Sequence, residues 1–132
     1  MATWVLKTEP STFSFQDLVE KKRAVWDGVA NPVAQKHIRG AQRGDLCVVY
    51  HTGKERAAVG LAEIASAPYP DPKDAKLHVF DLVPKGALAR PVTLDAIKAS
   101  PAFADSPLVT MGRLSVVPLT DLQWRALKKM AA

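Results

Sequence analysis

Residues 46–64 read LCVVYHTGKERAAVGLAEI, and this stretch decides the fold. Its first part, 46–51, is almost continuously apolar, which is typical of a strand buried on both faces. Residues 52–56 are polar and predict a hairpin loop. Apolar residues then resume and predict a second long strand over 57–67. Gly60 lies inside this strand and indicates a bulge or the close approach of another group.

Working outward from this hairpin, the pattern predicts further strands at 3–8, 77–83 and 114–119. Helices are expected at 14–22, 32–39, 93–99 and 120–130, whereas 25–29, 68–72 and 100–112 read mainly as irregular or loop segments. Strands that are mostly adjacent in sequence, with helices between them and at the ends, favour an α+β fold. We expect a small mixed or antiparallel β-barrel flanked by short helices.

The helix starts carry recognisable capping residues. Ser14 is a candidate N-cap, and Asn31-Pro32 reads as an N-cap followed by proline at the first helical position. Thr120 with Gln123 predicts a capping box at the start of the last helix. These local signals place the helix boundaries.

Composition limits the class of protein. The 132 residues are 48% hydrophobic and 23% charged, which predicts one globular domain over 1–132. No apolar run approaches the length that spans a bilayer, and the first residues do not resemble a secretory signal. The single cysteine, Cys47, excludes an intramolecular disulfide. We therefore expect a monomeric protein of the cytoplasm, or of the nucleus in a eukaryote, that does not bind membranes.

The formal net charge of +5 is a modest basic excess. It permits an anionic partner such as nucleic acid and does not require one. The basic residues are spread along the chain in small groups, so their meaning depends on whether the fold gathers them around one site.

The sequence shows no assembled catalytic or metal motif. Cys47 lies in an apolar run, and His37, His51 and His78 lie on three different elements. There is no zinc signature and no glycine-rich phosphate loop, so we expect no metal and no cofactor. One enzymatic alternative stays open, in which His51 and Glu63 act as acid and base on a nucleotide-like substrate.

Trp26 lies in a segment that reads as irregular, next to Asp27 and Gly28. A large flat ring on a loop suits the stacking of a planar ligand. Packing in the core is the alternative for this ring, and the residues alone do not decide between the two.

Several segments together resemble the EVE domain, a PUA-like family that is similar in fold to YTH domains. The resemblance covers nearly the whole chain, from Trp4 to Trp124. The matching segments are Trp4 with Lys7-Thr8-Glu9-Pro10 and Ser11-Thr12-Phe13-Ser14, Val25-Trp26-Asp27-Gly28-Val29 with Asn31, Gly44-Asp45-Leu46, Tyr50-His51-Thr52, Val59-Gly60-Leu61-Ala62-Glu63, Tyr69-Pro70-Asp71-Pro72, and Arg113-Leu114-Ser115-Val116 with Pro118.

This resemblance implies a non-catalytic module that reads a modified base of DNA or RNA, either a modified cytosine or a methylated adenine, in an aromatic-lined pocket. Trp26 would be the stacking wall, and Tyr69 a candidate second wall. The residues that would line or close the pocket are Lys7, Thr8, Glu9, Asn31, His51, Leu114 and Ser115. Lys7 and Arg113 would contact phosphate, whereas Asn31 has the alternative of being only a helix cap. A protein-interaction module with an unused pocket is a third hypothesis.

Overall fold

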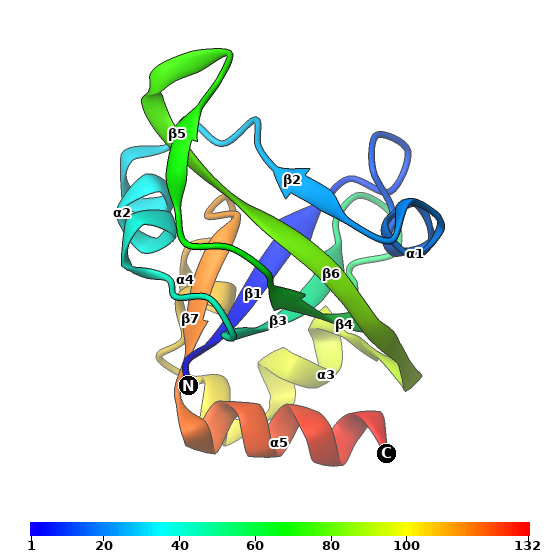
Figure 1. Cartoon of the computed structure of the whole chain (residues 1–132). Helices are drawn as coiled ribbons and strands as arrows, with labels where there is room; N and C mark the ends of the chain where they lie inside the picture. The colour runs from blue at the N-terminus through cyan, green and yellow to red at the C-terminus, as the bar shows by residue number, and fades with distance from the viewer.

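The computed structural model describes all 132 residues and contains one curled, mixed β-sheet (Figure 1). Its strands are β1 (Thr3–Thr8), β2 (Ala24–Trp26), β3 (Leu46–His51), β4 (Ala57–Ile64), β5 (Tyr69–Asp71), β6 (Asp74–Thr93) and β7 (Val116–Leu119). The helices are α1 (Phe15–Lys21), α2 (Pro32–Gly40), α3 (Leu94–Ala99), α4 (Pro107–Thr110) and α5 (Asp121–Ala131), with a 3-10 turn η1 (Pro101–Phe103).

The strand order is β2-β6-β4-β3-β1-β7, and β5 pairs with β6 outside this path. Only β1 and β3 run parallel, while every other pairing is antiparallel. The sheet curls into an open barrel whose outer strands in this order, β2 and β7, do not pair with each other. The predicted α+β fold around a small mixed barrel is therefore confirmed.

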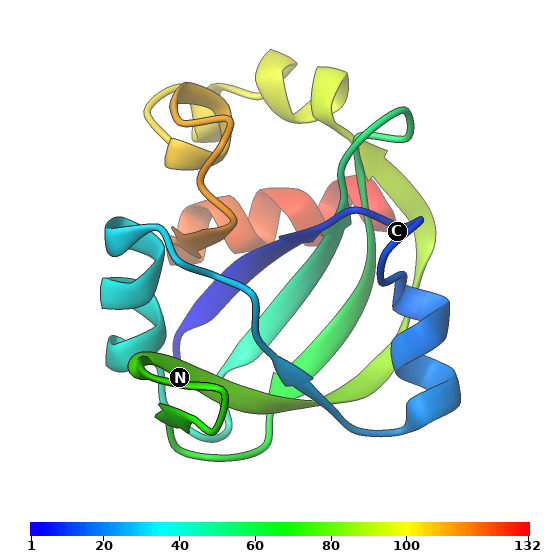
Figure 2. The same cartoon turned by 90° about the horizontal axis from the view of Figure 1, so that it is seen from above.

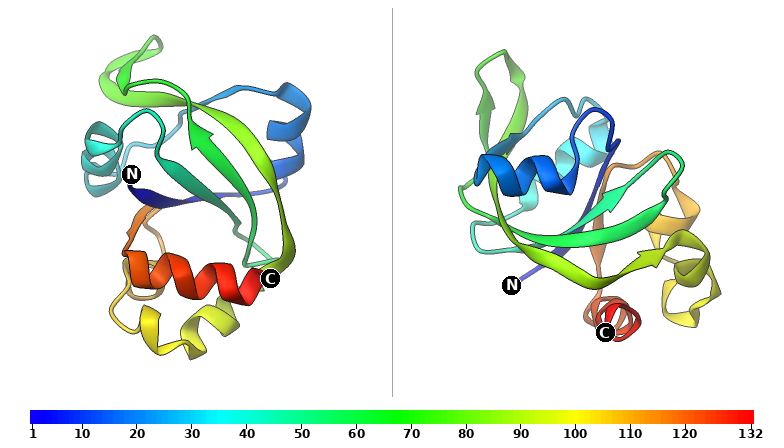
Figure 3. Two further views of the ribbon diagram at one scale, coloured as in Figure 1. Left: turned by 60° about the horizontal axis from the view of Figure 1, so that its bottom comes forward. Right: turned by 90° about the vertical axis from the view of Figure 1, so that its right-hand side faces the viewer.

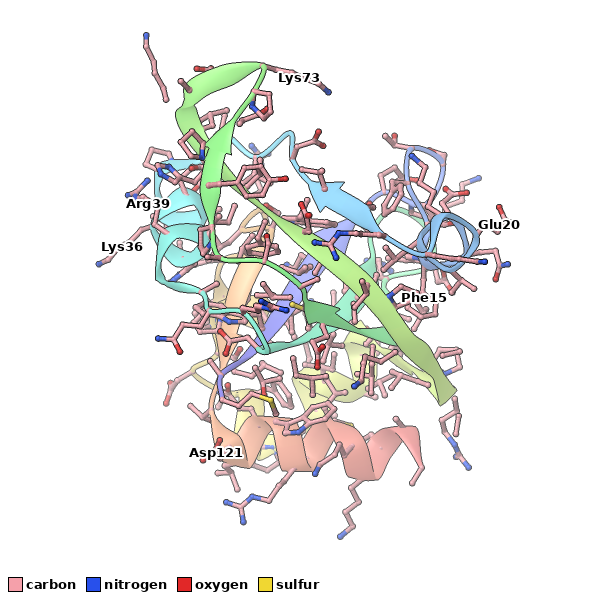
Figure 4. The ribbon with its side chains drawn as sticks, viewed as in Figure 1. Phe15, Glu20, Lys36, Arg39, Lys73 and Asp121 are labelled. Atoms are coloured by element: carbon pink, nitrogen blue, oxygen red, sulfur yellow. The ribbon has the colours of Figure 1, made fainter.

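The helices surround the sheet. α1 and α2 lie at opposite edges of it with β2 between them, whereas α3, α4 and α5 gather along another side (Figures 2 and 3). Charged side chains such as Glu20, Lys36 and Arg39 project away from the sheet (Figure 4). None of the helices combines the length and apolar character that crossing a membrane requires.

The capping predictions are confirmed. The Ser14 hydroxyl accepts a hydrogen bond from the N–H of Asp17, and the Asn31 side chain accepts from two backbone N–H groups of α2. Thr120 and Gln123 form the predicted capping box at the start of α5. These contacts are local, because each joins residues no more than three positions apart.

The sequence analysis predicted too few residues in β6 and missed the short strands that pair with it. A strand was predicted only over 77–83, whereas β6 continues to Thr93 through Pro84 and Gly86. It does so because β4 pairs along it, with a register irregularity where Leu61 faces Gly86 and Ala62 faces Pro84. The predicted loops at 25–29 and 68–72 were likewise wrong in part, since β2 and β5 form short strands against β6. Strands this short depend on their partner more than on their own sequence.

A core of 27 buried residues fills the inside of the curled sheet and the contacts with the helices. Gly60 is packed against Phe15 of α1. A Cβ at position 60 would lie 2.5 Å from the Phe15 ring, which confirms the predicted close approach. This contact packs the first turn of α1 directly against β4.

Candidate functional site

A cleft of about 890 Å³ opens on the side of the sheet that carries α1 and β2. Its wall comes from segments far apart in the sequence: the end of β1 with the loop after it, the end of α1, β2 with residues 27–29, and single residues of β6 and of the 111–115 loop. It is the larger of the two principal pockets of the molecule.

Trp26 lines this cleft and also belongs to the core. It is the last residue of β2, opposite Phe80 of β6, and the residue is only 7% exposed. The prediction that the ring lies on a loop is therefore wrong. The indole Nε1–H is buried and has no hydrogen-bond partner. Such an orphaned donor is uncommon in a native structure, and here it belongs to a residue that lines the cleft.

Lys7, Thr8 and Glu9 reach the cleft because β1 ends there. The Lys7 ammonium donates to the carbonyl oxygen of Gly112 at 3.0 Å, and partial burial lowers the pKa of Lys7. The Thr8 hydroxyl donates to the carbonyl oxygen of Phe13 at 2.6 Å and so shapes the loop after the strand.

Glu9 is exposed at the cleft and stays ionised. Its carboxylate accepts hydrogen bonds from the backbone N–H and the hydroxyl of Ser11, and these bonds lower its pKa. An ionised carboxylate has only acceptor positions. Glu9 is therefore suited to receive N–H donors from a ligand.

The charges that line the cleft balance. The cations are Lys7, Lys21 and Arg23. The carboxylates are Glu9, Asp27 and Asp81. A cleft with equal numbers of cations and acids suits a neutral polar ligand better than a strongly charged one.

Arg23 and Asp81 form an ion pair at 2.8 Å in this wall. The Tyr69 hydroxyl donates to the other oxygen of Asp81 at 2.5 Å. The hydrogen bond raises the pKa of Tyr69 to about 12, and the same bond, followed by the bonds from Arg23, lowers the pKa of Asp81. Tyr69 thus positions the wall residue Asp81 through a hydrogen bond and does not itself line the cleft.

The structure brings together five of the predicted site residues, which are Lys7, Thr8, Glu9, Trp26 and Ser115. It does not place the others in the cleft wall. Those are Asn31, His51, Tyr69, Arg113 and Leu114. Asn31 caps α2, Leu114 is buried in the core at 3% exposure, and Arg113 is exposed outside the cleft.

Both ring nitrogens of His51 form hydrogen bonds within the protein. Its Nε2 accepts a hydrogen bond from the Phe15 backbone N–H at 3.0 Å. The ring proton therefore resides on Nδ1, which donates to Glu55 at 2.6 Å. His51 faces Ala57 at one end of the β3–β4 ladder, and Glu63 faces Leu46 at the other.

His51 and Glu63 consequently lie about 17 Å apart along the strands, at roughly 3.3 Å per residue. Glu63 is 40% exposed and lies 3.6 Å from the Lys85 ammonium. The enzymatic alternative that used these two residues as one acid–base pair is wrong, because they cannot reach the same substrate atom.

The sequence analysis missed Arg23 and Asp81 as wall residues. Arg23 belongs to a short basic run, and Asp81 is one polar position of a predicted strand. Only the pairing of β2 with β6, which sets Val25 opposite Asp81, carries both to the cleft. No local signal reveals that pairing.

The structure contains no group of three or more His, Cys, Asp or Glu side chains that could hold a metal ion. Cys47 is fully buried in β3, where burial raises the pKa of its thiol. The thiol is therefore out of reach of a substrate or a metal ion from solvent.

Comparison with solved structures shows that the whole fold recurs. A protein from Rhodopseudomonas palustris superposes with a TM-score of 0.94 at 39% identity, over 99% of this chain and 93% of the other. A protein from Agrobacterium tumefaciens gives a TM-score of 0.95 at 29% identity, over 100% of this chain and 94% of the other. Human THYN1, solved in complex with DNA that contains 5-methylcytosine, has a TM-score of 0.92 at 23% identity, which shows a shared fold; the alignment covers 99% of this chain and 98% of the human one.

Sequence comparison agrees. Mouse thymocyte nuclear protein 1 is 28% identical over 154 residues, which cover 89% of this chain and 68% of the mouse protein. The model of the EVE domain family matches residues 2–130. The chain therefore belongs to the EVE domain family, and it shares its open mixed barrel with these solved structures.

Proposed function

We propose that this protein is a non-catalytic nucleic-acid-binding module whose cleft receives one modified base. The observation that carries the proposal is the orphaned indole N–H of Trp26 in the wall of an 890 Å³ cleft. A buried donor without a partner costs about 1–3 kcal/mol. A carbonyl oxygen or ring nitrogen on the edge of a base would supply the missing acceptor.

The acceptors of the cleft favour a base that has an exocyclic amino group. Asp81 already accepts hydrogen bonds from Tyr69 and Arg23, but the exposed carboxylate of Glu9 remains accessible to a ligand. Carboxylates accept hydrogen bonds from the amino group of cytosine, and adenine has a comparable donor. These contacts suit cytosine and adenine whether or not the base is modified. The modification is inferred from the family resemblance, so the proposed ligand is a modified cytosine or a methylated adenine. Human THYN1, of the same fold, has been solved with DNA that contains 5-methylcytosine.

The base must leave its stack to enter the cleft. Flipping a base out of a duplex costs a few kcal/mol, whereas a single strand presents it directly. Stacking on an aromatic ring returns about 1–3 kcal/mol per base. Since Trp26 is only 7% exposed, binding is expected to uncover part of its ring, and the indole N–H is the group that reports this change.

The test is a titration followed through the indole N–H signals in a proton–nitrogen NMR spectrum. The ligands are short single strands of one sequence that carry either cytosine or 5-methylcytosine at one position, with a matched pair for adenine and N6-methyladenine. The Trp26 signal is expected to shift with a modified strand. The Trp4 indole, which already donates to Asp45 at 3.0 Å, is the internal control and should not move.

The variant Trp26→Phe keeps an aromatic ring in the core and removes the donor. It is preferred to Trp26→Ala, because truncation of a buried tryptophan costs about 3–5 kcal/mol and threatens the fold. The Phe variant should remain folded and bind the modified strand more weakly, because its ring offers the base no donor. The proposal fails if no modified strand shifts the Trp26 signal, or if the variant binds the modified strand as tightly as the wild type.

A further inference from the structure

A second, smaller cleft of about 200 Å³ adjoins the first, and Lys7 lines both. The second cleft lies where the hairpin between β3 and β4 meets α3 and the 108–112 segment, as Figure 2 shows for the hairpin and α3. The Leu94 N–H donates to the Arg56 carbonyl at 2.8 Å and joins α3 to the hairpin. The proposed base site does not use this cleft.

The charges of the two clefts differ in kind. The smaller cleft is lined by three cations, Lys7, Arg56 and Lys98, and by no acidic residue. None of these cations takes part in the ion pairs of the structure, which join Arg23 to Asp81, His51 to Glu55, Lys73 to Asp27 and Lys85 to Glu63. The wall of the smaller cleft is thus positive; it shares Lys7 with the larger cleft, whereas Arg56 and Lys98 line the smaller cleft alone.

Lys7 is the most constrained of the three cations. Its ammonium is partly buried, lies 5.7 Å from the centre of the Tyr50 ring, and donates to the Gly112 carbonyl at 3.0 Å. A desolvated ammonium without a carboxylate gains from an anion more than a surface lysine does. Its position between the two clefts would let it contact a group attached to a base in the larger one.

Arg56 is held in an unusual backbone conformation, with φ of 44°, which is rare for a residue other than glycine. Strained positions of this kind occur preferentially at ligand sites, where the surrounding structure maintains them. The Leu94 hydrogen bond holds this one in place. The side chain of Arg56 is exposed and forms no ion pair in the structure.

Three carboxylates lie near this cleft without lining it. Asp95 of α3 acts on Tyr50 through space, Glu9 lies beside Gly53, and Glu55 is bound to His51. They offset part of the positive charge through space, but none borders the cavity itself, so the only charged groups in its wall are cations. Because like charges repel, these carboxylates disfavour a large anion. The cleft therefore favours a compact anion that approaches the three cations from its open side.

We propose that this smaller cleft is a phosphate subsite, in which Lys7, Arg56 and Lys98 bind a backbone phosphate next to the base held in the larger cleft. The inference rests on the proposed function and adds to it the position and chemistry of the backbone contact. The balanced cleft takes the neutral base, and the positive cleft takes the charged phosphodiester.

The first experiment removes two cations that lie outside the base cleft, in the variant Arg56→Gln/Lys98→Gln. The control is Arg90→Gln/Lys129→Gln, which removes the same charge from exposed residues that line neither cleft. Affinity for a fluorescent single strand that carries one 5-methylcytosine is measured over a series of salt concentrations. The first variant should bind more weakly and show a salt slope shallower by about 0.7, the value for one lost phosphate contact on a single strand. The control should keep the wild-type slope.

The second experiment tests the cleft without a base. Inorganic phosphate is titrated into the labelled wild-type protein, and the backbone amides of Thr52, Gly53 and Gly112 are followed by NMR. These signals should shift in the wild type and not in Arg56→Gln/Lys98→Gln. The free nucleoside of 5-methylcytosine, which has no phosphate, should bind the variant and the wild type equally.

The outcomes separate the two proposals. If the wild type binds the modified strand and the variant matches the control in affinity and slope, the phosphate subsite is overturned while the base site stands. If the wild type binds no strand but phosphate still shifts the three amides, the cleft is a site for free anions, and both proposals fail as stated. Absence of any shift with phosphate, together with an unchanged slope, also overturns the subsite.

Discussion

The ring of Phe15 occupies the space in which a side chain at position 60 would stand, so that a Cβ on Gly60 would lie 2.5 Å from the ring atom Cε1. The backbone N–H of the same Phe15 donates to His51 Nε2 at 3.0 Å. These two contacts seat the start of α1 on β4 and β3. Because the end of α1 contributes Lys21 to the larger cleft, these contacts also determine the position of one wall of that cleft.

Gly60→Ala is expected to destabilise the protein by about 1–3 kcal/mol, because the added methyl group overpacks a buried contact with an aromatic ring. Urea unfolding measures the loss. Gly40→Ala is the matched control, since nothing lies within 4 Å of a Cβ at that position, and it should leave the midpoint nearly unchanged. Equal midpoints for wild type and Gly60→Ala would contradict the observed packing.

His51→Ala is expected to cost about 1–3 kcal/mol, because it leaves the buried N–H of Phe15 without an acceptor. Glu55→Ala removes the other partner of the ring, but Glu55 is 44% exposed, so its loss should be smaller. Chemical denaturation of both variants checks the order. A His51→Ala protein as stable as the wild type would show that the hydrogen bond contributes nothing.

Asn31→Ala is expected to reduce stability by about 1 kcal/mol, since the side chain accepts from the N–H groups of Val33 and Ala34 at 2.9 and 3.1 Å. Asn31→Asp retains the cap and should keep the stability. Thermal unfolding and titration with a modified strand are measured on both variants. Retained stability with lost binding in Asn31→Ala would instead assign the residue to the ligand, as the family resemblance suggested.

Tyr69→Phe is expected to destabilise the protein by about 1 kcal/mol near neutral pH, because Asp81 loses its shortest hydrogen bond. The Tyr69 hydroxyl lowers the pKa of Asp81 below its ordinary 3.8, so this contribution is present above pH 3.8 and disappears as the pH falls through the lower folded-state value. The pKa of Tyr69 is raised from 10.0 to about 12, so the contribution is also lost as the pH rises through about 12.

Urea unfolding of the wild type and Tyr69→Phe, compared at neutral and strongly acid pH, checks this dependence. The difference between them should shrink in acid. Asp81→Asn provides the control, because adding Tyr69→Phe to it should bring little further pH dependence. A difference that stays constant from neutral to acid pH would rule out the ionised Asp81 as its source.

The parts of the fold that were predictable depend on residues close together in the chain. Ser14 and Thr120 cap their helices through contacts across three positions, and residues 46–51 form a strand because they are almost uniformly apolar. The extension of β6 to Thr93 was not predictable, since Pro84 and Gly86 argue locally against a strand. The length of β6 comes from its pairing with β4, and the paired residues lie too far apart in the chain for a local pattern to reveal the contact.

The same division applies to the site. The sequence by itself determined the capped starts of α1, α2 and α5 and the buried central hairpin, because capping and hydrophobic pattern are properties of neighbouring residues. It also singled out Lys7, Glu9 and Trp26, which the structure places in one cleft wall. The tertiary structure alone decided that Trp26 is buried with an unpaired N–H and that Asp81 stands in the same wall. It also decided that His51 serves the fold, since strand register and long-range packing determine which side chains meet and which atoms remain without a partner.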